Sequence, residues 1–107
     1  MGVSIKVSGE VVTAYLSGEL DHHSARDMRT EIDSAIELNM PSLVILDFGE
    51  ISFMDSSGIG LVMGRYRLLS QRNAKLHITG TSPALYKMMR LAGMERLATM
   101  DNIKKEG

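Results

Sequence analysis

The chain has 107 residues, of which 44% are hydrophobic and 23% are charged, a balance that predicts a compact domain with a buried core. With 12 Lys and Arg against 13 Asp and Glu, the formal net charge of -1 gives no electrostatic case for binding nucleic acid or an anionic membrane. The absence of cysteine excludes disulfides, thiolate metal sites and cysteine nucleophiles.

No apolar run approaches the length of a membrane span, and the N-terminal segment lacks the apolar centre of a signal peptide. The sequence also contains no internal repeat, low-complexity segment or interdomain linker. We therefore expect one cytoplasmic domain over residues 1–107, with a protein or a small molecule as its partner.

The first third of the chain predicts a β-hairpin followed by a helix. Residues 3–7 alternate apolar and polar, and residues 11–16 are rich in β-branched and aromatic side chains, with a turn at residues 8–10. The polar segment 18–24 comes next, and we expect Ser24 to cap the helix that follows it. Apolar residues then recur at helical steps until Asn39-Met40-Pro41 ends the helix: Ala25, Met28, Ile32, Ala35 and Ile36.

The middle of the chain predicts a buried strand and a second helix. The apolar run 43–48 is the expected strand, and residues 49–53 lead from it into a turn. After the turn, one apolar face is expected to pack on the sheet, formed by Ile59, Val62, Met63, Tyr66 and Leu69. Leu61, Arg65 and Leu68 lie on another face, which is a candidate contact surface.

The last third predicts a short strand at residues 74–79 and a third helix. Ser82 caps this helix, Pro83 lies in its first turn and Gly93 closes it. Its expected buried stripe is Leu85, Met88, Met89 and Ala92. Residues 94–100 can form a last strand, and residues 101–107 are expected to fray. The order β-β-α-β-α-β-α, with a possible terminal β, predicts an α/β domain with a mixed sheet and helices mainly on one face.

The turn Met54-Asp55-Ser56-Ser57-Gly58-Ile59-Gly60 joins the buried strand to the second helix. The first four N–H groups of a helix lack intrahelical partners and carry the positive end of its dipole, and Asp55 or Ser56 can cap them. The glycines remove side chains, so another molecule can approach the backbone. Two interpretations remain open: a hydroxyl that a partner recognises or modifies, or a helix cap alone.

A phosphorylated serine at this turn would act as a switch. The phosphate adds about −1.5 to −2 units of charge, which the helix dipole tolerates, so the fold survives. A partner surface built against a neutral hydroxyl would instead meet a dianion beside Asp55, and binding would be lost.

Three other chemistries receive weaker support from the residues. A serine hydrolase needs a histidine base beside Ser56 or Ser57, and the turn lacks the nucleophile-elbow pattern. His22-His23 is more simply a solvated loop pair than a metal site, because no other spaced ligand set accompanies it. The glycines at 58, 60 and 64 suggest a nucleotide site, but their spacing misses the dinucleotide motif; Gly60 and Gly64 more simply allow close helix packing.

Two motifs together resemble a known family. Residues 52–60, continuing through Gly64-Arg65-Tyr66, and Gly18-Glu19-Leu20-Asp21-His22-His23 closely resemble the anti-sigma factor antagonists of spore-forming bacteria, within the STAS domain family. The expected element order agrees along nearly the whole chain. The Asp21-His22-His23 run is more similar to the antagonists of anti-sigma F factors, the stage II sporulation group, than to stress-response relatives.

The resemblance implies a partner-switching protein that is not an enzyme and holds no cofactor or metal. The unphosphorylated antagonist binds an anti-sigma factor that is also a serine kinase, and thereby releases the sporulation sigma factor, sigma F. The kinase uses ATP to phosphorylate the first serine of the motif, which maps to Ser56, and a serine phosphatase reverses the step. The partner surface maps to Asp21, Asp55, Ser56, Ser57, Gly58, Ile59 and Gly60.

One departure from the family concerns the C-terminus. Relatives tend to continue into a further helix, whereas this sequence ends in the short segment 102–107, which is mostly polar. Two functions of other classes compete with the switch. A small domain that binds or hydrolyses ATP or GTP would turn over nucleotide by itself. A purely structural interaction domain would have a Ser56 that the kinase leaves unmodified.

Overall fold

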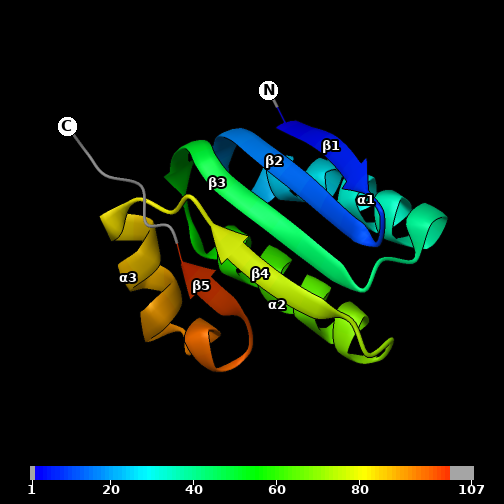
Figure 1. Cartoon of the computed structure of the whole chain (residues 1–107). Coiled ribbons are helices and arrows are strands. Elements are labelled where there is room, and N and C mark those ends of the chain that lie inside the picture. The colour runs from blue at the N-terminus through cyan, green and yellow to red at the C-terminus, as the bar shows by residue number, and fades with distance from the viewer. Residues whose placement is uncertain (1, 102–107) are drawn as a thin grey trace.

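The computed structural model describes residues 2–101, which form one α/β domain (Figure 1). Its elements in chain order are β1 (Gly2–Ser8), β2 (Val11–Leu20), α1 (His22–Asn39), β3 (Leu43–Met54), α2 (Ser56–Ser70), β4 (Lys75–Thr79), α3 (Pro83–Leu91), the 3-10 helix η1 (Met94–Arg96) and β5 (Thr99–Asp101). The strands form one sheet in the order β1-β2-β3-β4-β5. β1 is antiparallel to β2 and every other pair is parallel, so the predicted mixed sheet and element order are confirmed.

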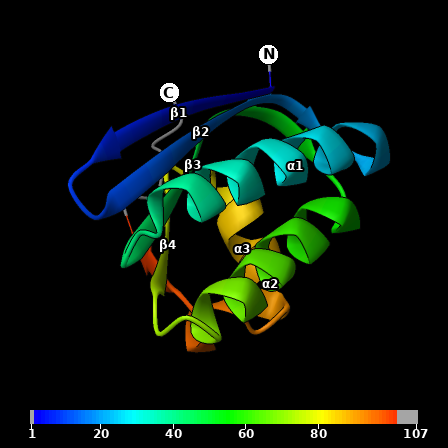
Figure 2. The same cartoon turned by 90° about the vertical axis from the view of Figure 1, so that its right-hand side faces the viewer.

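The helices cover one face of the sheet. Figure 2 shows α1 and α2 side by side against the strands, and Figure 1 views the opposite face, which no described helix covers. Alternate residues of the central strands point toward the helices and are fully buried, as the period of two in a strand requires. They are Val12, Ala14 and Leu16 of β2, Val44, Leu46 and Phe48 of β3, and Leu76 and Ile78 of β4. In the described part of the chain, no helix combines the length and hydropathy of a membrane span.

Two strands are longer than the sequence predicts. β2 continues through Gly18 to Leu20 and β3 continues to Met54, where the predictions placed a polar turn and a lead-in segment. Parallel pairing holds both extensions, with Gly18 opposite Ile51 and Leu20 opposite Met54, after shifts in register. Their periodicity is weak because these segments are bulged and only partly buried, so tertiary pairing decides their conformation.

The face of α2 also differs from the prediction. Leu61 and Arg65 are buried, because α1 lies against that side of the helix. Ile59, Met63, Tyr66 and Leu68 are half-buried and pack on the core, and Val62 and Leu69 are buried as expected. Leu61 and Arg65 therefore pack between α1 and α2, and they are not part of a freely exposed face as the sequence had suggested.

The C-terminal third matches the prediction in type and differs in detail. Ser82 caps α3 and accepts a hydrogen bond from the Leu85 amide at 3.2 Å, as predicted. Ala92 is exposed rather than buried, and the expected strand at residues 94–100 is η1 followed by the short β5. Asp101 is the last residue of β5 and pairs with Thr79 of β4, so it belongs to the sheet and not to the frayed tail. The frayed tail over residues 102–107 and the question of a further helix lie outside the described residues.

Candidate functional site

The N-termini of α1 and α2 lie next to each other at one edge of the sheet. The parallel register that places Leu20 opposite Met54 makes Asp21 and Asp55 the next residues of neighbouring strands. The Asp55 amide donates a hydrogen bond to the Leu20 carbonyl at 3.2 Å, which holds the two chain segments together. Asp21 and Asp55, which are 34 positions apart in the sequence, therefore belong to one site.

At the start of α2, Asp55 is the helix cap and Ser56 is not. Its carboxylate accepts a hydrogen bond from the Ser57 amide at 2.8 Å, and its carbonyl accepts one from the Gly58 amide at 3.0 Å. Ser56 is the first residue of the helix and is exposed, while Ser57 is half-buried. The Ser56 hydroxyl is thus not used for capping and faces solvent at the positive end of the helix dipole.

At the start of α1, the cap is Asp21 rather than the predicted Ser24. The Asp21 carboxylate accepts hydrogen bonds from the His23 amide at 3.0 Å and the Ser24 amide at 2.9 Å. The Ser24 hydroxyl returns the contact by accepting from the Asp21 amide at 3.0 Å, which completes a capping box. These hydrogen bonds, above all the one from the Ser24 amide, hold the pKa of Asp21 below its ordinary value of 3.8.

The residues predicted to contact a partner differ in exposure. Ser56 and Gly60 are exposed, and Asp21, Asp55, Ser57 and Ile59 are half-buried. Gly58 is buried, and a Cβ atom added there would overlap the Cγ and Sδ atoms of Met54 and approach Leu20 Cδ2 to 3.1 Å. A glycine at 58 is therefore required by the core beneath the turn and offers no surface of its own.

The sequence predicted that the two histidines lie in a loop, but they belong to the first turn of α1. His22 and His23 are both exposed, and their rings meet edge to face with centroids 5.5 Å apart. Within residues 2–101, no group of three or more His, Asp or Glu side chains gathers to hold a metal ion. Nor does a hydrogen bond in that range join a histidine to the Ser56 or Ser57 hydroxyl, the contact that a serine hydrolase needs.

The glycines of the suggested nucleotide motif all lie inside α2. Because α2 begins at Ser56, residues 58, 60 and 64 are helical and do not form the loop that would wrap a phosphate chain. Gly60 and Gly64 have open space where a Cβ would lie, so close helix packing is not their role and that interpretation was wrong.

Phe53 is a candidate contact residue that the sequence reasoning missed. Its side chain is 51% exposed although it is a large aromatic residue on β3, two positions before Asp55. Exposed aromatic side chains are enriched at protein contact surfaces. Its position in an unrecognised strand extension hid it, because the side chain that precedes the buried Met54 in a strand points to the opposite face.

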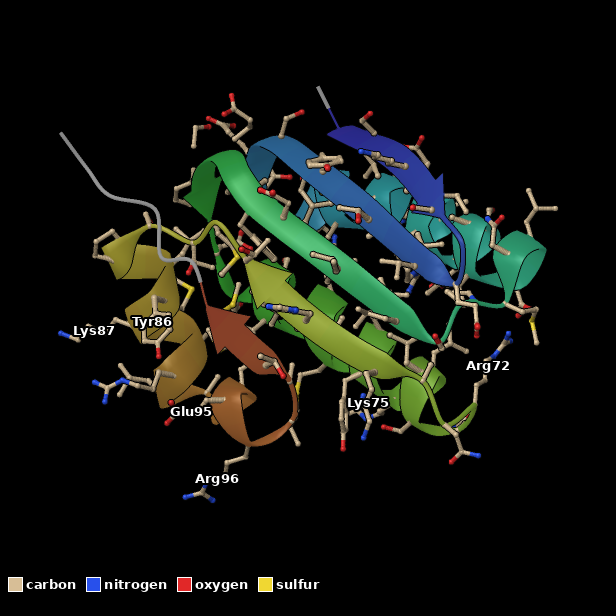
Figure 3. All side chains as sticks on the ribbon, in the orientation of Figure 1. Arg72, Lys75, Tyr86, Lys87, Glu95 and Arg96 are labelled. Atoms are coloured by element: carbon tan, nitrogen blue, oxygen red, sulfur yellow. The ribbon has the colours of Figure 1, made fainter. Side chains whose placement is uncertain are left out.

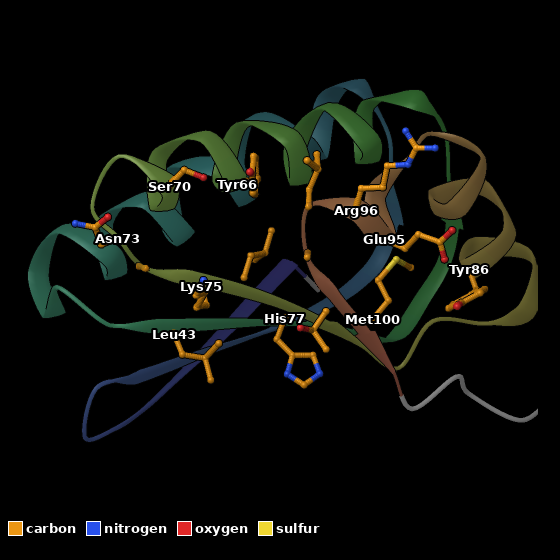
Figure 4. A pocket seen from close by; sticks show the side chains of 15 residues that line it. Leu43, Tyr66, Ser70, Asn73, Lys75, His77, Tyr86, Glu95, Arg96 and Met100 are labelled. Atoms are coloured by element: carbon orange, nitrogen blue, oxygen red, sulfur yellow. The ribbon is translucent and has the colours of Figure 1, made fainter.

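A larger hollow, of about 970 Å³, lies away from these residues, where β4, η1 and β5 meet (Figures 3 and 4). Figure 4 shows Tyr66 and Ser70 on the α2 side of the strands and Leu43 and His77 on the other side. The hollow therefore wraps around an open sheet edge, and none of the predicted site residues lines it. Volume alone does not make it the functional site.

Comparisons with known proteins identify the family to which this chain is similar. The family model of the STAS domain matches residues 3–106. The anti-sigma F factor antagonist of Lysinibacillus sphaericus is 38% identical over 82% of this chain and 75% of its own length. The structure of the anti-sigma factor antagonist SpoIIAA in its unphosphorylated form is similar with a TM-score of 0.80 and 33% identity, covering 94% of this chain and 89% of the other. The phosphorylated form of the Bacillus cell fate determinant SpoIIAA is similar with a TM-score of 0.75 and 33% identity, covering 94% and 92%.

Proposed function

The chain belongs to the STAS domain family, and from this we propose that it is an anti-sigma factor antagonist that phosphorylation of Ser56 switches off. In this proposal the unphosphorylated chain binds an anti-sigma factor that is also a serine kinase, and the bound kinase releases the sporulation sigma factor, sigma F. The proposal locates this chain in the cytoplasm.

The observation that carries the proposal is the position of Ser56. The serine is exposed at the first position of α2, and Asp55, rather than Ser56 itself, supplies the cap. The hydroxyl is therefore accessible to a kinase and can be modified without removing a hydrogen bond from the fold. The similar SpoIIAA structure in a phosphorylated form supports the same kind of modification in this chain.

The covalent step belongs to the partner and not to this chain. The Ser56 oxygen attacks the γ-phosphorus of ATP held by the kinase, the bond to the β-phosphate oxygen breaks, ADP leaves and the serine proton passes to a kinase base. A serine phosphatase hydrolyses the phosphate ester and restores the hydroxyl. This chain supplies the accessible acceptor and needs no cofactor for that role.

The switch follows from where the new charge would lie. A phosphate at the N-terminus of α2 interacts favourably with the helix dipole and with nearby backbone N–H groups, so it does not destabilise the helix. The partner surface, by contrast, would have to bury or face a dianion where it had met a neutral hydroxyl. We expect this surface to include Asp21, Asp55, Ser56, Ser57, Ile59 and Gly60, with the exposed ring of Phe53 at its margin.

Replacing Ser56 with Asp tests the switch. We expect the thermal midpoint of Ser56→Asp to stay within about 2 °C of the parent, because a negative charge at the first helical position is tolerated. Binding to the anti-sigma kinase should weaken by at least about tenfold, because the partner then meets a charge. Calorimetry and titration by fluorescence anisotropy give the two quantities.

Ser34→Asp is the matched control, since Ser34 is an exposed serine of α1 that is remote from the turn. It adds the same charge and should leave kinase binding unchanged. Incubation of the parent chain with the kinase and ATP, followed by mass spectrometry, should place the phosphate on Ser56. An unmodified Ser56 would favour the purely structural interaction domain, and loss of folding in Ser56→Asp would sink the switch.

A further inference from the structure

A basic cleft of about 470 Å³ lies between α1 and α2, beside the Ser56 turn. Four arginines line it, Arg26 and Arg29 from α1 and Arg65 and Arg67 from α2, whereas no Asp or Glu residue does. Ser57, which adjoins the proposed phosphorylation site, also lines the cleft. This concentration of positive charge is unexpected in a chain whose formal net charge is -1.

Within residues 2–101, only one of the four arginines, Arg65, has an acidic partner. Arg65 is only 7% exposed, and its Nε lies 2.9 Å from Asp33 Oδ1, although the two groups are not aligned for a hydrogen bond. Burial lowers the pKa of the Arg65 guanidinium, Asp33 opposes this shift and the neighbouring charge of Arg29 adds to it. In the described part of the chain, Arg26, Arg29 and Arg67 make no ion pair. Like charges held together in this way favour an anionic ligand.

The cleft also has room for a ligand along the helices. Gly60 and Gly64 lie one turn apart on its α2 wall, and a Cβ at either position would meet no other atom within 4 Å. From Ser57 to Arg67 the wall is about 15 Å long at a rise of about 1.5 Å per residue. That length matches four or five residues of an extended chain at about 3.3 Å per residue.

The opposite side of α1 shows that the arginines are segregated and not scattered. A second hollow, between α1 and the strands β1 and β2, is lined by the acidic residues Glu19, Asp21, Asp27 and Glu31 and by no Arg or Lys. α1 thus presents Asp27 and Glu31 toward β1 and β2, and Arg26 and Arg29 toward α2, where Asp33 pairs with Arg65. The near-neutral total hides two surfaces of opposite sign, and the basic one adjoins Ser56.

We propose that the cleft between α1 and α2 binds an acidic, extended segment of the protein partner that recognises Ser56. The inference rests on the proposed function for the identity of that partner. A single phosphate group would engage only one or two of the exposed arginines, whereas a segment with several carboxylates can reach Arg26, Arg29 and Arg67 together. Ser57 of the turn lines the cleft, so one partner can contact both.

Binding in the cleft would increase the effect of Ser56 phosphorylation on partner affinity. Ser56 immediately precedes Ser57, which lines the cleft, so a phosphate on Ser56 lies close to the cleft. It repels the carboxylates of the acidic segment and draws on the same positive field, so it weakens binding along the cleft as well as at the turn. The cleft also predicts strongly salt-dependent association for the unphosphorylated chain.

The first experiment uses a synthetic hexaglutamate peptide and the uniformly ¹⁵N-labelled chain. We expect saturable NMR shifts at Arg26, Arg29, Gly60 and Gly64, and their loss in the double variant Arg26→Glu/Arg29→Glu. Both arginines are exposed, so the variant should stay folded, which circular dichroism checks. The double variant Lys87→Glu/Arg90→Glu changes two exposed residues of α3, makes the same change in charge and should bind hexaglutamate like the parent. Lys87 is labelled in Figure 3.

Two outcomes of this titration overturn the inference. One is the absence of saturable shifts in the cleft. The other is that inorganic phosphate saturates the same residues at lower concentration than hexaglutamate does, which would make the cleft a phosphate site. Retained binding in Arg26→Glu/Arg29→Glu would assign the shifts to another surface and would also overturn it.

The second experiment uses the anti-sigma kinase itself. The Arg26→Glu/Arg29→Glu variant should bind at least about tenfold more weakly than the parent, with a shallower dependence on salt. Unchanged affinity and salt dependence would contradict the proposal that the cleft binds an acidic segment of the kinase, but would not contradict the proposed function. If the parent fails to bind the kinase while hexaglutamate occupies the cleft, the proposed function fails and the acidic-segment site stands.

Discussion

The two helix starts that form the site are neighbours in space but are built differently. At the start of α1, Asp21 accepts hydrogen bonds from two amides and Ser24 completes the capping box, with its hydroxyl also donating to the Glu19 carbonyl at 2.6 Å. At the start of α2, the Asp55 carboxylate accepts a hydrogen bond from one amide only, and the exposed residue Ser56 follows it. The side chains at the start of α1 therefore form hydrogen bonds with one another, whereas the start of α2 leaves the Ser56 hydroxyl exposed.

The start of α1 therefore acts as a fixed scaffold, whereas Ser56 at the start of α2 provides a surface that modification can change. The polar groups at the start of α1 are committed to one another, so their role is to fix where α1 begins. The start of α2 keeps its geometry through Asp55 and Gly58 and leaves Ser56 to interact with other molecules. A modification at Ser56 therefore alters the surface while the scaffold beneath it stays in place.

The largest effect on stability is expected from the scaffold of α2 itself. Gly58→Ala should lower the free energy of unfolding by about 1–3 kcal/mol, because the added methyl group overlaps Met54 in the core. Urea denaturation measures this change. Gly60→Ala is the matched control: its methyl group meets open space, and replacing a helical glycine should raise stability by up to about 1 kcal/mol. Equal effects at the two positions would contradict the assignment of Gly58 to packing and Gly60 to the surface.

A smaller effect is expected from the single capping side chain of α2. Asp55→Ala should lower the free energy of unfolding by about 1 kcal/mol, because the Ser57 amide loses its acceptor. Asp55→Asn keeps an acceptor oxygen and should retain most of that stability. Thermal and urea denaturation of the two variants provide the comparison. If Ala and Asn behave alike, the cap does not depend on the side chain and the start of α2 is held by packing alone.

The smallest effect at neutral pH, and a distinctive one in acid, is expected at the start of α1. Because the folded state lowers the pKa of Asp21, its carboxylate contributes stability that is fully present above the unfolded pKa, near 3.8. That contribution is lost as the pH falls from 3.8 through the folded pKa. Asp21→Asn cannot titrate, so its stability deficit relative to the parent should shrink over this range. Urea denaturation between pH 3 and 6 tests this, and a constant deficit would show that the hydrogen bonds do not favour the charged form.

The local sequence determined most of the fold. The helical repeat from Ala25 to Ile36, the apolar run from Leu43 to Phe48 and the Ser82-Pro83 start are interactions within a few residues, and each produced the predicted element. The Asp-Ser-Ser-Gly turn was likewise placed correctly at a strand-to-helix junction, because a cap, a serine pair and a glycine suit the start of a helix. The terminal strand was anticipated only in outline, since the 3-10 turn before it carries no periodic signal.

Tertiary structure decided what the site contains. The register of β2 against β3 extended both strands and brought Asp21 beside Asp55, a pairing that neither motif encodes alone. Contact with α1 buried Arg65, and contact with Met54 explained Gly58, so residues that read as surface became interior. The arginine cleft exists only because two amphipathic helices lie side by side. Composition and periodicity describe a chain one segment at a time, whereas burial, register and electric field depend on which segments meet.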